Sequence, residues 1–206
     1  TPKNLILYLD KLFLIIISYL TEVNIMSKEN FKFQAEVGKI LNIVANSLYS
    51  EKEIFVREYI SNASDACDKL RYESLQNTKL RNTEDFKILI SFSKKNKSIT
   101  ISDNGIGMEK EELINSLGTI AKSGTEEFIK KLEASKEKNI EQIGRFGVGF
   151  YSGFMVAQEI TVLSRKAGKN ESWKWSSDGK GGFNLEKDVT QLIGTKVILK
   201  LKSDAK

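Results

Sequence analysis

Histidine is absent from the 206 residues, and cysteine occurs once, as Cys67. A structural zinc site needs about four cysteine or histidine ligands, so the composition excludes one. The same absence excludes a Ser-His or Cys-His nucleophile pair within the chain. A single thiol cannot form an internal disulfide, which is typical of a reducing compartment such as the cytoplasm. Cys67 lies among apolar helical positions and is interpreted as a packing residue.

Proline also occurs only once, so no proline-rich linker divides the chain, and residues 26–206 are expected to form one domain. The apolar run Leu12–Leu20 is shorter than the ~20 residues that cross a bilayer, and no membrane partner is expected. Residues 1–25 are interpreted as an extra segment upstream of a natural start at Met26. A targeting segment and a docked amphipathic helix are the alternatives.

Basic residues are only slightly more numerous than acidic ones. The chain has 32 basic and 27 acidic residues, a net charge of +5, and the two signs are interspersed. This pattern is typical of a solvated surface and not of a nucleic-acid interface, so no nucleic-acid partner is expected.

What the chain does contain is an acidic residue followed by two glycines at the end of a strand. The alternating segment Ser98–Ile101 runs into Asp103, Gly105 and Gly107. A carboxylate can accept hydrogen bonds from an amino group, and the glycines let the backbone approach a flat ligand closely. The segment alone is weak evidence, because Asn-Gly also marks an ordinary turn.

A second polar group lies on a predicted helix over residues 51–72, which begins with a capping box at 50–53. Glu58, Asn62 and Asp65 are spaced i, i+4 and i+7, which places them in one narrow stripe beside the apolar face. A carboxylate there can polarise a water molecule, and an amide oxygen can coordinate magnesium. The alternative is a solvated helix edge on which Asp65 pairs with the lysine one turn later.

A third segment combines helices, polar joints and glycines over about residues 115–145, which favours a mobile lid. The alternative is that this segment is a fixed surface loop that does not move. Gly144, Gly147 and Gly149 close this segment before an apolar run over residues 150–157 that is expected to be helical. Free amides at such a helix start bind phosphate, although a tight turn is the alternative for any one glycine. The spacing is neither a Rossmann fingerprint nor a P-loop.

Further helices and strands follow from periodicity. Helices are expected over residues 37–48, 109–117 and 126–132, and short strands over 31–33, 86–92, 98–102, 159–165, 171–176, 182–185 and 195–201.

Together these motifs resemble the N-terminal domain of the ninety-kilodalton heat-shock chaperones of bacterial type, a branch of the GHKL ATPase superfamily. The segments that carry the resemblance lie in the same order over about residues 30–201: Phe31–Glu36, Tyr49–Phe55, Arg57–Ala66, Asp103–Met108, Leu117–Thr125 and Phe146–Ser152. The resemblance implies an α/β (α+β) two-layer sandwich, in which helices cover one face of a mostly antiparallel sheet and a helical lid closes over the nucleotide. It implies a slow ATPase of a chaperone that assists protein folding in the stress response.

The resemblance also implies roles for the residues that act on the phosphates. Glu58 is expected to be the general base that activates water, and Arg57 to hold it in an ion pair that keeps the resting enzyme slow. Asn62 is expected to coordinate Mg²⁺. The remaining expected phosphate-side and lid contacts are Lys122, Gly147, Gly149 and Phe150.

At the base end, Asp103 is expected to accept the adenine amino proton. Gly107 and Met108 would form the pocket wall there, and the Thr195 hydroxyl would support adenine through water. The remaining expected nucleotide contacts are Asp65 and Ser116.

The chain departs from the pattern of this family at two positions. Arg145 stands where the family is expected to have glutamine, and Ser116 where it often has asparagine. The family also has a middle domain that supplies a catalytic arginine and a C-terminal domain that dimerises, and neither is expected within these 206 residues. The chain is therefore expected to be a monomer that binds ATP or ADP and turns ATP over weakly. Client proteins, co-chaperones and homodimerisation would belong to the full-length protein.

Two other classes stay open at this point. The chain fits a nucleotide-sensing GHKL module that binds without turnover. It also fits a GHKL ATPase that acts on DNA, although no strong basic patch supports that reading.

Overall fold

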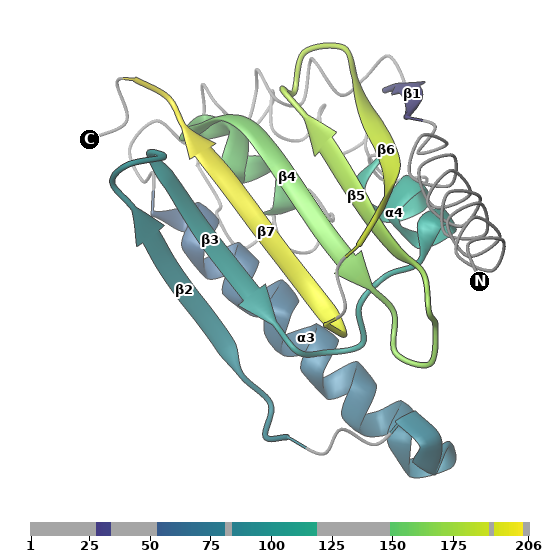
Figure 1. Ribbon diagram of the computed structural model, residues 1–206. Coiled ribbons are helices and arrows are strands. Elements are labelled where there is room, and N and C mark those ends of the chain that lie inside the picture. The colour runs from purple at the N-terminus through teal and green to yellow at the C-terminus, as the bar shows by residue number, and fades with distance from the viewer. Residues whose placement is uncertain (1–27, 34–52, 81–83, 119–148, 190–191, 204–206) are drawn as a thin grey trace, which may run out of the picture.

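The computed structural model describes residues 28–33, 53–80, 84–118, 149–189 and 192–203. Its seven strands form one sheet in the order β1-β6-β5-β4-β7-β3-β2, in which every neighbouring pair is antiparallel. The strands are β1 Glu29–Lys32, β2 Ile88–Ser93, β3 Ser98–Asp103, β4 Ala157–Arg165, β5 Ser172–Ser177, β6 Gly182–Asp188 and β7 Gly194–Leu201. Figure 1 shows the sheet face-on.

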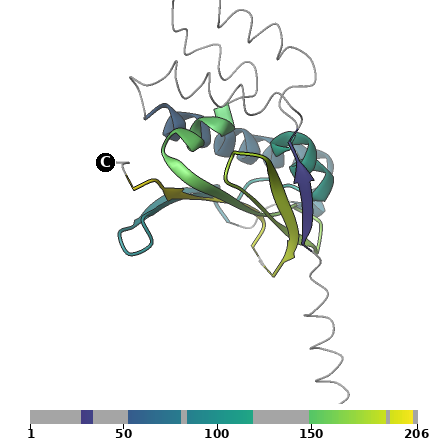
Figure 2. The same ribbon diagram turned by 90° about the horizontal axis from the view of Figure 1, so that it is seen from above.

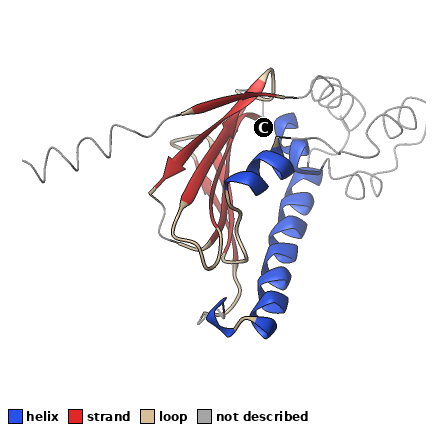
Figure 3. Cartoon of the chain, turned by 90° about the vertical axis from the view of Figure 1, so that its right-hand side faces the viewer, coloured by secondary structure: helices blue, strands red, loops and turns tan. Residues whose placement is uncertain are grey.

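The described helices lie on one face of this sheet, so that the molecule has two layers (Figures 2 and 3). They are the α-helices α3 Ile54–Gln76 and α4 Lys110–Leu117 and the 3-10 helices η1 Thr78–Leu80 and η2 Gly149–Met155. This arrangement confirms the α/β sandwich that the sequence predicts. The predicted lid and the helices expected over residues 37–48 and 126–132 lie outside the described residues.

The core fills the space between the two layers, because alternate residues of the central strands face the helices. Trp175 of β5 and Leu199 of β7 are 0% exposed, as is Leu113 of α4. The Trp175 ring stacks on Phe183, with 5.7 Å between ring centroids, and meets Phe150 edge-on at 5.5 Å. The aromatic contacts tie η2 to the sheet from the helical side.

Strand β4 begins with an irregularity that matters for its later residues. Ala157 is paired with Leu201 and Glu159 with Lys200, so one residue bulges out between them. From Ile160 onward the pairing with β7 is regular. The bulge explains why buried side chains of β4 are first three residues apart, at Ala157 and Ile160, and then two apart.

Several predicted boundaries differ from the structure. Helix α3 begins at Ile54, with Glu53 as its N-cap and no side-chain cap bond, and it continues to Gln76. The start expected at residue 51 is therefore early, and Ser50 of the expected capping box lies outside the described residues. The segment expected as a helix over 150–157 forms the 3-10 turns of η2, and the chain is already in β4 at Ala157. The Ser152 hydroxyl donates to the Gly149 carbonyl within these tight turns.

Candidate functional site

A cavity of about 280 Å³ lies between helix α3 and the sheet. Its wall comes from α3, β3, the loop after β3, the end of α4, η2, β4 and β7. The predicted site residues that line it are Glu58, Asn62, Asp103, Gly107, Met108, Ser116, Gly149, Phe150 and Thr195. Three segments that are far apart in the sequence thus meet at one hollow, as the motifs predict. The rest of the wall is mostly apolar, which is typical of pockets for small organic ligands.

Asp103 stands at the end of β3 and is the half-buried carboxylate of this cavity. Burial raises the pKa of its carboxyl to about 6, and backbone amides of Gly105 and Thr195 act in the opposite direction. The Gly105 N–H donates to Asp103 Oδ1 at 2.9 Å. The carboxylate is thus held by its own loop, and it is ionised at neutral pH as an acceptor for a ligand amino group.

The loop after β3 is held by backbone contacts on two sides. The Ile106 N–H donates to the Ala66 carbonyl of α3 at 3.0 Å, and the Ala167 N–H donates to the Ile106 carbonyl at 2.8 Å. Gly107 has a φ of +66°, and a Cβ at this position would overlap the Arg165 carbonyl. Glycine is therefore required here, both for the left-handed conformation and for the close approach.

Glu58 is the buried carboxylate on the helical side of the cavity. It is 9% exposed, and its Oε1 lies 3.4 Å from Arg57 Nη2. The guanidinium side is open, because the Arg57 side chain is 60% exposed. Gly149 lies directly against the carboxylate, since a Cβ there would overlap Glu58 Oε2. The space beside Glu58 Oε2 thus exists because residue 149 has no side chain.

Asn62 lies one turn further along α3; it is exposed and also lines the cavity. Asp65 is exposed as well but does not line it. At that level of the helix, Gly105 packs against the backbone of Ala66, and Ala66 forms the wall. The stripe of three polar residues expected from helical spacing is therefore divided, with two members at the cavity and the third at the outer surface.

The remaining predicted site residues are placed as follows. Ser116 of α4 lines the cavity, and so does Phe150, whose carbonyl accepts a hydrogen bond from Tyr59 Oη at 2.6 Å. Lys122 and Gly147 lie outside the described residues, as does Arg145. Among the described residues, no group of three or more histidine, cysteine, aspartate or glutamate side chains could hold a metal ion. No helix in the described part of the chain is long and apolar enough to cross a membrane.

Two residues near the site were missed by reasoning from sequence. Tyr59 lies on the buried face of α3 and lines the cavity, where its hydroxyl fixes η2. Ser164 is fully buried on β4, and its hydroxyl accepts a hydrogen bond from the Met108 N–H at 2.8 Å. A serine in the inward register of a strand, between Val162 and the strand end, was the available signal.

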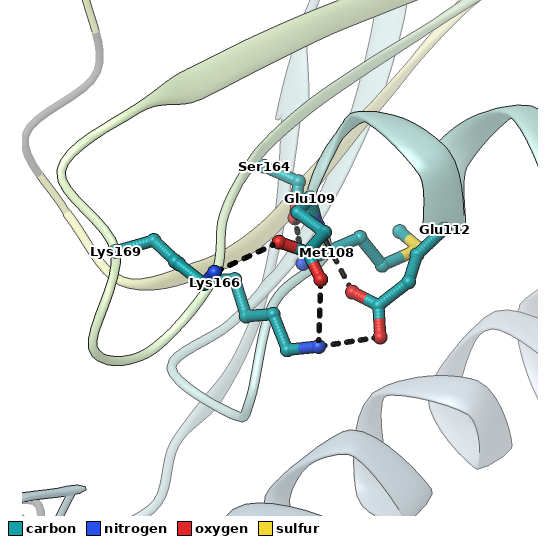
Figure 4. A network of polar contacts seen from close by, with 6 residues as sticks. All are labelled: Met108, Glu109, Glu112, Ser164, Lys166 and Lys169. Atoms are coloured by element: carbon teal, nitrogen blue, oxygen red, sulfur yellow. Dashed lines mark hydrogen bonds and ion pairs between the residues drawn. The ribbon is translucent and has the colours of Figure 1, made fainter.

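A network of charged groups fixes the loop that carries Met108 (Figure 4). Glu109 and Glu112 form a reciprocal capping box at the start of α4, in which the Glu109 N–H donates to Glu112 Oε2 at 3.0 Å. Lys166 Nζ lies 2.6 Å from Glu112 Oε1, and Lys169 Nζ lies 3.3 Å from Glu109 Oε2. The hydrogen bond from Lys169 and the nearby Lys166 charge lower the pKa of the Glu109 carboxyl. The network thus ties α4 to the β4–β5 loop.

Comparison with known proteins places the chain in one family. Residues 49–197 match the family described as histidine kinase-, DNA gyrase B-, and HSP90-like ATPases. The chain is 57% identical over 180 residues to the chaperone protein HtpG of Roseobacter denitrificans, covering 87% of this chain and 29% of that protein. It is 55% identical over 180 residues to HtpG of Wolbachia pipientis wMel, covering 85% and 28%, and 52% identical over 182 residues to HtpG of Francisella tularensis subsp. novicida, covering 87% and 29%.

The chain therefore spans under a third of the length of these curated relatives. The matched region includes all the residues that line the cavity, from Glu58 to Val197. The resemblance inferred from the sequence motifs is confirmed: this chain belongs to the histidine kinase-, DNA gyrase B- and HSP90-like ATPases.

Proposed function

We propose that this chain is the ATP-binding N-terminal domain of a cytoplasmic chaperone, and that it hydrolyses ATP slowly with Mg²⁺. The observation that carries the proposal is that Asp103 and Glu58 line the same cavity. The Asp103 carboxylate can accept a hydrogen bond from a nucleobase, and the Glu58 carboxylate is buried on α3, on the other side of the cavity. Clients, co-chaperones and homodimerisation would belong to a longer protein of the HtpG kind, as would a role in the stress response.

At the base end, Asp103 accepts a hydrogen bond from the adenine amino group, and Thr195 supports the base beside it. Gly107 and Met108 form the wall against which the ring lies. The apolar lining from Ile101, Val162 and Val197 excludes water from the ring faces. The partial burial of Asp103 fits this role, because a carboxylate in a low-dielectric wall binds a donor more strongly than one in water.

At the phosphate end, Asn62 is the residue that would hold Mg²⁺, through its amide oxygen. The donor set is modest, which suits a metal that keeps several waters and is held mainly by substrate phosphates. When bound, Mg²⁺ neutralises charge on the phosphates. Gly149 lies against Glu58 with no side chain between them, and Gly149 and Phe150 both line the cavity at this end.

Glu58 acts as the general base that orients water and accepts its proton. The neighbouring Arg57 competes for the same carboxylate and slows this step. Phosphoanhydride hydrolysis depends chiefly on positioning and charge compensation, so a single base and a fixed cradle suffice for slow turnover.

Two measurements test the proposal. Calorimetry with ADP should show tight binding for the wild-type chain and a loss of at least about tenfold for Asp103→Asn. Single-turnover hydrolysis should fall by about 10²–10⁴-fold in Glu58→Ala. Equal hydrolysis rates would remove Glu58 from the mechanism and leave a nucleotide-sensing module. Equal ADP affinities would remove Asp103 from the adenine site.

A further inference from the structure

The Ser164 hydroxyl lies behind the cavity wall, where none of the roles proposed above uses it. Ser164 is 0% exposed and is not itself part of the wall. Its neighbours Met108 and Thr195 are both part of the wall. Figure 4 shows the Ser164 side chain directed at the Met108 backbone.

Three polar groups surround the Ser164 hydroxyl oxygen. The Met108 N–H donates to it at 2.8 Å, the Gly194 carbonyl accepts from it at 3.1 Å, and Thr195 Oγ1 lies 3.0 Å away. A hydroxyl has one proton and two lone pairs. Either hydroxyl could donate in the contact between Ser164 and Thr195. The Gly194 carbonyl can only accept, so it is satisfied only when the Ser164 proton goes to it, and the contact between the two hydroxyls is then made by the Thr195 proton. All three hydrogen-bonding positions of Ser164 are then filled.

In this arrangement the Thr195 hydroxyl proton is directed at Ser164, and the Thr195 lone pairs remain for a ligand in the cavity. Asp103 stands on the neighbouring strand as the Cα partner of Thr195, and Ser164 is the partner of Thr195 on the other side. The three side chains thus share one face of the sheet in a single row. The cavity end of this row presents acceptors only: an ionised carboxylate and a hydroxyl whose proton is already engaged.

We propose that Ser164 is a positioning residue that fixes Thr195 as a hydrogen-bond acceptor, and that it thereby favours a purine with an amino group over one with an oxo group. The proposal rests on the nucleotide function proposed above and adds a specificity determinant to it. An exocyclic amino group supplies donors to this pair of acceptors. An oxo group offers only lone pairs, which face lone pairs across the cavity. Discrimination is strong where buried polar groups would be left unpaired.

The test compares ADP with inosine diphosphate, whose base carries an oxo group in place of the amino group and a proton on N1. The N1 proton is present in every variant, so the change in preference between wild type and Ser164→Ala reports the contact of Thr195 with the oxo group. In Ser164→Ala the Thr195 hydroxyl loses its acceptor, rotates, and can donate to the oxo group. The preference for ADP over inosine diphosphate, measured by calorimetry on the 206-residue chain, should fall about tenfold. A change that only loosened the loop would weaken both ligands alike. An unchanged preference in Ser164→Ala therefore overturns the proposal.

Three further variants sharpen the result. Ser172→Ala is the matched control, because Ser172 is also a buried strand serine that donates to a backbone carbonyl, that of Asp188 at 2.7 Å, away from the cavity. It should keep the full preference. In Thr195→Val, adding Ser164→Ala should change the preference by less than about twofold, because the hydroxyl that Ser164 orients is gone. A full tenfold change in that background would contradict the proposal. Ser164→Cys, which keeps the volume but bonds weakly, gives the same comparison should the alanine variant not fold.

The outcome is distinguishable from failure of the proposed function. A wild-type chain that binds neither nucleotide overturns the nucleotide site itself. A wild-type chain that prefers ADP, with the same preference in Ser164→Ala and Ser164→Cys, overturns only the role of Ser164.

Discussion

Asp103 and Thr195 are Cα partners on the neighbouring antiparallel strands β3 and β7, so their side chains stand next to each other on the face covered by the helices. Thr195 also donates its backbone N–H toward the Asp103 carboxylate, which opposes the effect of burial on the Asp103 pKa. A carboxylate with a raised pKa beside a hydroxyl, in a largely apolar wall, has a measurable effect on both binding and stability.

Asp103→Asn should stabilise the fold at neutral and alkaline pH while it weakens ADP binding. The Asp103 pKa is raised from 3.8 to about 6 in the folded chain, so the folded state binds more protons than the unfolded state between these values. The contribution of Asp103 to stability is therefore full below pH about 4 and lost as pH rises through about 6. Urea unfolding of wild type and variant should give a difference in unfolding free energy that grows by about 1–3 kcal/mol from pH 4 to pH 8. A difference that is constant with pH would contradict this origin.

The affinity for ADP should rise with pH through about 6, because the ionised Asp103 accepts from the amino group and the protonated acid does not. Calorimetry at intervals from pH 5 to pH 8 measures the midpoint. Asp103→Asn should remove the part of this rise that comes from Asp103 and leave only the pH dependence of the ADP phosphate, whose second pKa is about 6. The difference between the two profiles separates Asp103 from other titrating groups. A wild-type profile without a rise in this range would argue against Asp103 as the acceptor.

Gly149→Ala should slow hydrolysis by at least about tenfold, because the new methyl group overlaps the Glu58 carboxylate and displaces the base. Gly181→Ala is the control, since a Cβ at residue 181 has nothing within 4 Å. Circular dichroism should show that both variants fold. Single-turnover rates that are equal for the two variants would show that the space beside Glu58 is not needed.

Arg57→Ala should raise the hydrolysis rate by up to about fivefold, because the pair with Glu58 is open to solvent on the arginine side and such pairs are weak. Arg71→Ala on the same helix removes an exposed ion pair with Asp68, neither of which lines the cavity, and it should leave the rate unchanged. Should Arg57→Ala turn over more slowly than wild type, Arg57 would instead assist the reaction.

The sequence predicted those parts of the site that depend on local spacing. Glu58 and Asn62 follow from helical periodicity, and Asp103 follows from the end of an alternating strand. Asp65 fits the same helical spacing but lies outside the cavity, because spacing does not tell where a neighbouring loop meets the helix. Ser164 could not be found in this way, since its partners come from loops and strands that only the order of the sheet brings together.

The same difference between local spacing and contacts distant in sequence explains which helices and strands were predicted correctly. The strands expected over 159–165 and 195–201 agree with β4 and β7 to within a few residues, and the helix expected over 109–117 agrees with α4 to within one residue. The run after Gly149 was assigned to a regular helix because it is apolar. Glycines at 149 and 153 and the Ser152 hydroxyl bond to the Gly149 carbonyl favour tighter turns there, and Gly153 lets the Tyr59 hydroxyl pack against its backbone.

The bulge at the beginning of β4 confines that strand's irregularity to a point before the cavity. Strict alternation from Ile160 is what turns Val162 and Ser164 inward and sends Leu163 and Arg165 to the opposite face. Losing the one surplus residue near position 158 would merely straighten the strand. Deleting Leu163 would shift the register of the residues after it by one, so that each of their side chains would turn to the opposite face of the sheet. The Arg165 side chain would then take the place of Ser164 behind the cavity wall.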